Sequence, residues 1–196
     1  MSRIARVAEA FHAVGITVWA MALGGSALAA AVVFPEMKAL GPALPGYASY
    51  TGDHWMIAAG HVGRKVFAIS DGVELGASAV AVVALAYLTR CGFVRGWWGA
   101  LRWMGVGLAA GLAIYNGLVL APRMDMALVA YWEAAKEGRN QEAAAYREVF
   151  SAEHPLASRI KGTSLTALLL STAIAAAARK NSAPPPCTPK EQPRPG

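Results

Sequence analysis

The sequence predicts an all-α protein, an integral membrane four-helix bundle. Apolar residues make up 56% of the 196 residues, and charged residues make up only 15%, below the roughly 25% usual in soluble domains. The charges are separated by long uncharged intervals, several of them close to the roughly 20 residues that a helix needs to cross a bilayer. We expect a single membrane domain over residues 1–178 and a disordered, proline-rich tail over residues 179–196.

Three of the four predicted spans are uncharged apolar runs. Residues 14–34 form the first span, residues 103–122 the third and residues 162–178 the fourth. Basic residues stand directly before and after the third and the fourth run, as is typical of the ends of membrane helices. These intervals predict three helices that cross the bilayer.

The second predicted span, residues 66–89, contains two acidic residues, Asp71 and Glu74. A charged residue at the centre of a spanning helix costs about 2.5–3.5 kcal/mol on insertion scales. The segment that follows, residues 75–88, is apolar, and Arg90 flanks it. We expect a span here because its omission would leave an odd number of helices and a buried half-helix.

The basic residues indicate an orientation for the bundle. The 18 Lys and Arg residues divide evenly between the two sides, but the inner segments are shorter, and short segments are where basic residues determine topology. We therefore expect both termini in the cytoplasm, with Trp97, Trp98 and Trp103 at the inner membrane interface. Cys91 and Cys187 then lie on the reducing side, so no disulfide is expected.

Two longer segments are predicted on the outer side. Residues 35–65 are rich in proline and aromatic residues, and we expect an irregular loop near the membrane surface. Residues 123–158 carry apolar side chains at helical spacing, which predicts an extramembrane amphipathic helical hairpin between the third and fourth spans. Gly138 is expected to end its first helix, and Asn140 is expected to cap its second.

Short motifs mark the ends of three spans. The third span ends in Tyr115-Asn116-Gly117-Leu118-Val119-Leu120-Ala121-Pro122-Arg123-Met124, the first ends in Phe34-Pro35, and Phe150, His154 and Ser158 precede the fourth. Over residues 14–178 these motifs resemble those of the transmembrane protein 205-like family, a four-helix membrane domain of unknown function. The chain departs from that pattern at Pro155, in its longer first outer loop, and at Asp71 and Glu74. The resemblance implies a four-helix membrane protein without an established catalytic activity.

Helical periodicity places Asp71, Glu74 and Ser78 on one face of the second span. Burial of an unpaired carboxylate is prohibitive, so a partner is required. Arg123, at the outer end of the third span, is the expected partner. Three interpretations stay open. The acids can form a structural salt bridge, they can form a site for a cation or a proton, because ionisable groups within a membrane are functional candidates, or they can be protonated and have no function.

Polar residues of the third span are expected beside these acids. At a rise of about 1.5 Å per residue, Tyr115 and Asn116 lie at a depth in the outer half of the bilayer similar to that of Asp71 and Glu74. We expect Tyr115 and Asn116 to donate hydrogen bonds to the carboxylates. Together with Ser78 and Arg123, they complete the predicted polar intramembrane cluster.

Metal and cofactor sites are not expected. His54, His61 and His154 fall on the outer side together with several methionines, and imidazole with thioether is a ligand set that suits copper. His61 and His154 also precede spans at the same surface, as two axial haem ligands would. No pair of these residues shows ligand spacing, so we favour core or interface positions over a copper or haem site.

Glycines at a spacing of four residues indicate surfaces where helices approach closely. Gly72 and Gly76 form one such pair, and Gly107 and Gly111 form another. Packing within the chain is the default expectation. Contact with other membrane subunits, through these glycine faces or through the 123–158 hairpin, is the alternative.

The functional hypotheses are non-enzymatic. The sequence contains no phosphate-binding glycine loop with a lysine, no His-Glu-x-x-His motif and no evident nucleophile with a base. It also lacks a basic patch interleaved with aromatic residues, so nucleic acid is not an expected partner. The leading hypothesis is a structural or accessory protein of the lipid bilayer. The alternatives are an ion- or proton-coupled transporter or ion-responsive protein that uses Asp71 and Glu74, and a subunit of a larger membrane complex.

Overall fold

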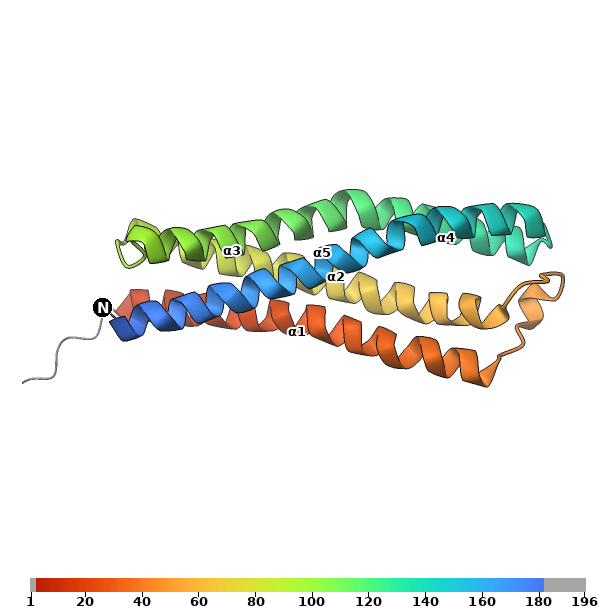
Figure 1. Cartoon of the computed structure of the whole chain (residues 1–196), viewed down its shortest axis with the longest axis horizontal. Helices are drawn as coiled ribbons and strands as arrows, with labels where there is room; N and C mark the ends of the chain where they lie inside the picture. The colour runs from red at the N-terminus through yellow and green to blue at the C-terminus, as the bar shows by residue number, and fades with distance from the viewer. Residues whose placement is uncertain (1–2, 182–196) are drawn as a thin grey trace, which may run out of the picture.

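The computed structural model describes residues 3–181, and all regular secondary structure in this range is helical (Figure 1), which confirms the all-α class. A five-residue π-helical turn, η2, joins the third and fourth helices, and a short 3-10 helix, η1, lies in the first loop. The elements are α1 (Arg3–Leu40), η1 (Pro45–Tyr47), α2 (His54–Arg90), α3 (Gly96–Tyr115), η2 (Asn116–Leu120), α4 (Ala121–Lys136) and α5 (Asn140–Asn181).

The helices form an elongated antiparallel bundle, in which α3, η2 and α4 follow one another as a single rod (Figure 1). The start of α1, the turn between α2 and α3 and the end of α5 lie at one end of the bundle, called here the terminal end. The α1–α2 loop and the α4–α5 turn lie at the opposite end, called the loop end. Helix α1 packs along α2, and α5 packs along α3 and α4, so the bundle consists of two pairs of rods.

In the described part of the chain, four helical segments are long and apolar enough to cross a membrane. Three of them contain a predicted span, and the fourth covers all but the last residue of the predicted span 162–178. Large apolar side chains on these helices point outward, such as Ile69 at 70% exposure and Val83 at 69%. An apolar exterior of this kind is favourable in lipid and unfavourable in water. The four segments are Arg3–Leu40, His54–Arg90, Gly96–Lys136 and Asn140–Ala177.

The helices extend well past the apolar runs, and this corrects the predicted loop over residues 35–65. Helix α1 continues through Pro35 to Leu40 and α2 begins at His54, so the segment between the two long helices is only residues 41–53. A proline within a membrane helix is tolerated where local adjustments and neighbouring helices satisfy the freed backbone groups. The run of apolar residues therefore marks where a helix can cross lipid, but not where the helix ends.

The segment predicted as a hairpin, residues 123–158, comprises most of α4 and the first part of α5. Both parts are continuous with the long apolar helices rather than separate from them. At the other end of the chain, α5 includes residues 179–181, which were predicted to be part of the disordered tail. The rest of that predicted tail, residues 182–196, lies outside the described residues.

A second core at the loop end explains why α2, α4 and α5 continue beyond the apolar runs. Tyr50 from the loop, Ile57 from α2, Tyr131 and Trp132 from α4 and Ala143 from α5 are buried together there. The hydroxyl groups of Tyr50 and Tyr131 lie 3.0 Å apart, so one of them donates a hydrogen bond to the other. Burial of these large aromatic side chains stabilises helical turns that lie beyond the apolar runs.

The α4–α5 turn depends on Gly138 and Asn140. Helix α4 ends at Lys136 and Gly138 adopts a left-handed φ of +71°, as predicted for a helix-ending glycine. The side chain of Asn140 was predicted to cap α5, but it binds the first loop instead. Its Oδ1 accepts a hydrogen bond from the Thr51 amide at 2.9 Å, and its Nδ2 donates to the Ser49 carbonyl at 3.2 Å.

The glycines that permit close helix packing are not the predicted ones. A Cβ at Gly15 would lie 3.1 Å from the Ala77 carbonyl of α2, and a Cβ at Gly105 would lie 3.0 Å from the Ala167 carbonyl of α5. A Cβ at Gly72, Gly76, Gly107 or Gly111 would meet nothing within 4 Å. The expectation that these four glycines pack within the chain is therefore wrong.

Candidate functional site

Lys161 binds both acidic residues of α2. Its Nζ donates to Oδ1 of Asp71 at 2.6 Å and to Oε1 of Glu74 at 2.7 Å. The Glu74 side chain is 5% exposed, and the side chains of Asp71 and Lys161 are each 19% exposed. We call these three residues the ion triad. It connects α2 of one helix pair with α5 of the other.

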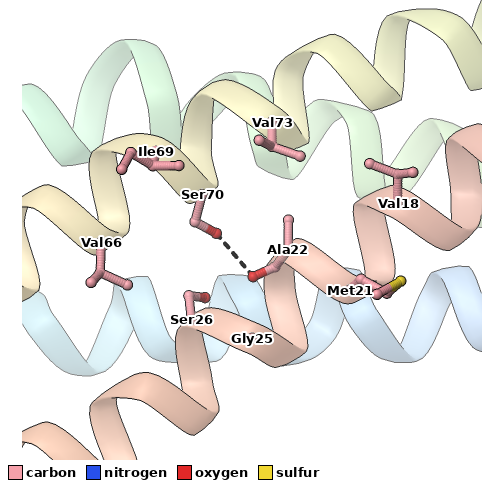
Figure 2. Close-up of a pocket in the computed structure, with 9 residues that line it drawn as sticks. All are labelled: Val18, Met21, Ala22, Gly25, Ser26, Val66, Ile69, Ser70 and Val73. Carbon is pink, nitrogen blue, oxygen red and sulfur yellow. Dashed lines mark hydrogen bonds between the residues drawn. The ribbon is translucent and has the colours of Figure 1, made fainter.

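Ser70 connects the ion triad to α1. Its Oγ lies 3.0 Å from Oε1 of Glu74 and also 3.0 Å from the carbonyl oxygen of Ala22. Figure 2 shows the Ser70 side chain on α2 pointing toward the Ala22 carbonyl of α1. Ser70 is itself buried, so these contacts are made away from bulk solvent.

Asn116 reaches the ion triad from the π-helical turn. Pro122 has no N–H, and its ring clashes with the carbonyl oxygen four residues earlier, so it disturbs the regular helix before it. A π-helical turn is one way for a helix to absorb such a disturbance. In this turn Asn116 is buried, and its Nδ2 donates a long hydrogen bond of 3.4 Å to Oδ1 of Asp71.

Arg123 is not the partner of Asp71, contrary to our expectation. Its guanidinium pairs with Glu153 of α5, and its side chain is 58% exposed. Arg123 belongs to the first turn of α4, whereas Lys161 extends from the middle of α5. In the sequence, Lys161 is indistinguishable from the basic residues that ordinarily flank a span, and no signal marked it as a ligand of the acids.

The structure brings only some of the other predicted members of the polar cluster together. Asp71, Glu74 and Asn116 come together. Ser78 is buried, but its hydroxyl donates to the Leu75 carbonyl of its own helix at 2.8 Å. Tyr115 is 41% exposed and lies outside the ion triad. The site is therefore smaller than predicted, with Ser70 and Lys161 in place of Ser78, Tyr115 and Arg123.

A second polar cluster, which the sequence did not indicate, lies toward the terminal end. Arg102 of α3 donates from Nη2 to Oε1 of Glu9 at 2.9 Å and from Nε to Nε2 of His12 at 3.2 Å. Because Nε2 of His12 accepts this bond, the ring proton is on Nδ1, which donates to the Ala81 carbonyl at 2.8 Å. His12 is 2% exposed and Arg102 is 8% exposed, so the cluster joins α1, α2 and α3 inside the bundle.

The histidines considered as metal ligands lie in separate environments. His54 accepts a hydrogen bond on Nδ1 from the Leu44 amide at 3.0 Å, and its Nε2 lies 3.2 Å from the Tyr50 carbonyl. His154 stacks on Phe150 with ring centroids 5.5 Å apart. Within residues 3–181, no three His, Cys, Asp or Glu side chains gather into a group that could hold a metal ion.

His61 stacks on Trp132 with ring centroids 3.8 Å apart, and its Nε2 lies 3.2 Å from the Tyr47 hydroxyl. Burial raises the pKa of the Tyr47 phenol above its ordinary value, so this hydroxyl stays protonated and can donate a hydrogen bond to the imidazole. Arg64 lies over the face of the same indole, 5.9 Å from its centroid, and pairs with Asp125 of α4. These contacts join α2 and α4 at the loop end.

An apolar groove opens beside the ion triad, between α1 and α2. It has a volume of about 380 Å³, and Ser70 and Ser26 supply hydroxyl groups to an otherwise apolar wall (Figure 2). Ser26 donates its own proton to the Leu23 carbonyl at 3.0 Å. The groove is lined by Val18, Met21, Ala22, Gly25, Ser26, Val66, Ile69, Ser70 and Val73.

Residues 3–181 form an all-helical bundle with four helices apolar enough to span a membrane and a largely buried ion triad between two of them. This architecture is compatible with a multi-pass membrane protein. In comparisons with family models, curated proteins and solved structures, nothing matches this chain. The resemblance to the transmembrane protein 205-like family therefore stays a prediction that rests on its short motifs.

Proposed function

We propose that the chain is a non-enzymatic multi-pass membrane protein with a structural or accessory role, and with both termini in the cytoplasm. In this proposal the ion triad holds the two pairs of helices together in the bilayer. The observation that carries it is the position of the Lys161 ammonium, which binds Asp71 and Glu74 at 2.6 and 2.7 Å.

Charged side chains are costly in lipid. An acidic residue within a membrane span is expensive unless it is paired and hydrogen-bonded. Here the partner of both acids comes from α5, which packs mainly on α3 and α4 rather than on α2. Separation of the helix pairs would remove Lys161 from both acids, and the cost of these lost contacts opposes the separation.

The test is a comparison of two lysine variants in unfolding experiments on the detergent-solubilised protein. Lys161→Met should lower the free energy of unfolding by about 3–5 kcal/mol, because it leaves Asp71 and the buried Glu74 without their cation. Lys65→Met is the matched control, since Lys65 is an exposed lysine of α2 outside the ion triad. Equal stability of the two variants would contradict the proposal.

A triple variant separates the pairing of charges from a general effect of substitution. Asp71→Asn, Glu74→Gln and Lys161→Met together remove every charge of the ion triad and leave none unpaired. Replacement of a whole buried ion cluster is often neutral or stabilising, whereas removal of one partner is not. The triple variant should therefore recover most of the stability that Lys161→Met loses.

A second candidate function is that of a subunit in a membrane complex, and the open glycine faces favour it. Gly72 and Gly76 on α2, and Gly107 and Gly111 on α3, have no neighbour within 4 Å of an added Cβ. Small residues at this spacing let helices approach closely in lipid. Since no helix within residues 3–181 packs on these faces, they are available to another helix.

Light scattering of the detergent-solubilised protein tests this candidate. We expect the wild-type protein to have a mass above that of one chain. The combined variant Gly72→Leu and Gly76→Leu should have a lower mass. Val83→Leu serves as the control, because Val83 is exposed on the same helix but outside the glycine pair. A monomeric protein that purifies without any companion would contradict the subunit role.

A further inference from the structure

The charges of the ion triad do not balance. Asp71 and Glu74 together share one ammonium group, so two ionised carboxylates would leave one negative charge in excess. The other groups that bind here are uncharged: the Asn116 amide of η2 contacts Asp71, and Ser70, which contacts Glu74, also contacts the Ala22 carbonyl of α1. Such an excess charge is costly inside a membrane protein, and one bound proton would remove it.

The hydrogen bonds of Ser70 show where that proton fits. A serine hydroxyl has one proton to donate and can accept two hydrogen bonds. Ser70 Oγ lies 3.0 Å from two oxygens, those of the Ala22 carbonyl and of Glu74 Oε1, and its single proton cannot make a full hydrogen bond to both at once. If Glu74 carries a proton on Oε1, that proton is donated to Ser70 Oγ, and Ser70 donates to Ala22. Both close contacts are then hydrogen bonds.

Asp71 is the poorer position for the proton. Its Oδ1 faces two donors, the ammonium of Lys161 at 2.6 Å and the amide Nδ2 of Asn116 at 3.4 Å, and both favour an ionised carboxylate. Its side chain is 19% exposed, whereas that of Glu74 is 5% exposed, so the charged form of Asp71 loses less hydration. A neutral Glu74 still accepts a hydrogen bond from Lys161.

We propose that Glu74 is a proton-binding site, which holds one exchangeable proton while Asp71 and Lys161 form an ion pair beside it. This inference rests on the proposed function, because it concerns the same ion triad in a membrane-spanning bundle. It adds that the connection between the helix pairs is electrically neutral. A transporter coupled to protons would require a site of this kind.

Infrared spectroscopy of the protein in lipid nanodiscs at neutral pH tests how many of the carboxyl groups of Asp71 and Glu74 carry a proton. The wild-type protein should show one carboxylic-acid carbonyl band, which shifts in D2O. Lys161→Met should increase the band to that of two carboxylic acids, because both acids then lack a cation, and Lys65→Met should leave it unchanged. Absence of the band in the wild-type protein would overturn the inference, although the loss of stability in Lys161→Met would still support the ion triad as a structural connection.

Chemical labelling tests which residue carries the proton. A hydrophobic carbodiimide adds to a protonated carboxyl group: the carboxyl oxygen bonds to the central carbon, and the proton moves to a carbodiimide nitrogen. The adduct then rearranges to a stable acylurea, which mass spectrometry of the digested protein locates. The apolar groove between α1 and α2, with Ser70 on its wall, suits entry of such a probe.

The wild-type protein should be labelled at Glu74. Asp71→Asn should abolish this label even though Glu74 is intact, because Glu74 then becomes the sole carboxylate available to Lys161 and ionises. Lys65→Met should be labelled as the wild type is. A label on Asp71, or on neither residue, would overturn the assignment of the proton to Glu74.

Discussion

Lys161 and Glu74 are 87 residues apart in the sequence, and the ammonium of one lies 2.7 Å from a carboxylate oxygen of the other. This contact joins α2 to α5, two helices that otherwise belong to different pairs. Because Lys161 also binds Asp71, a single side chain of α5 contacts both acids of the second predicted span. The ion triad thus explains how that segment can be part of a membrane bundle.

The packing of α3 against α5 should depend on the absence of a side chain at Gly105. A Cβ there would lie 3.0 Å from the backbone oxygen of Ala167, which cannot move without the helix. Gly105→Ala should lower the free energy of unfolding by about 1–3 kcal/mol through overpacking. Gly107→Ala is the control: its Cβ meets nothing, and alanine is a better helix former by about 1 kcal/mol. Equal denaturation midpoints for the two variants would disprove this account of the contact.

The polar cluster toward the terminal end should stabilise the bundle through Arg102. Arg102→Met removes the hydrogen bonds to Glu9 and His12, and we expect a loss of about 1.5–3 kcal/mol, the range for hydrogen bonds to charged groups. Arg90→Met, at an exposed arginine of α2, should have a much smaller effect. Thermal unfolding in detergent measures both. No difference between the variants would mean that the cluster contributes nothing to stability.

The α4–α5 turn should require glycine at residue 138. Gly138→Ala places a Cβ on a backbone with φ of +71° and 2.8 Å from the Cβ of Ser49, and the left-handed conformation alone costs about 1–2 kcal/mol. Because Asn140 binds residues 49 and 51, hydrogen exchange should accelerate in the first loop as well as in the turn. Gly162→Ala, at an open helical position, is the control. Unchanged exchange in the loop would contradict the coupling.

The hydroxyl pair of Tyr50 and Tyr131 should contribute to the core at the loop end. Tyr50→Phe and Tyr131→Phe each remove one partner of the 3.0 Å hydrogen bond, and a double-mutant cycle should give a coupling of about 0.5–1.5 kcal/mol. Tyr146→Phe, at a tyrosine that is 40% exposed, should couple to neither. A coupling energy of zero would indicate that the two hydroxyl groups are equally well satisfied without each other.

The sequence by itself determined the helical class and the four apolar segments. Bilayer thickness requires about 20 apolar residues in each spanning helix, and runs of this length can be recognised from the local composition of the chain. Helical periodicity also placed Asp71 and Glu74 on one face, and similar depth placed Asn116 near them, as the structure shows. These features depend on local composition, or they follow from the regular rise and turn of a single helix.

The partners across the bundle were decided only by the tertiary structure. Lys161 binds residues 87 and 90 positions away, and which of several flanking cations reaches the acids depends on how the helices are rotated and displaced. The same holds for the glycines, since Gly15 and Gly105 face another helix while Gly72 and Gly107 face outward. Burial of aromatic residues at the loop end likewise extended the helices past their apolar runs. Rotation and displacement are set by the sum of many side-chain contacts between helices, and a pattern within any single helix does not contain them.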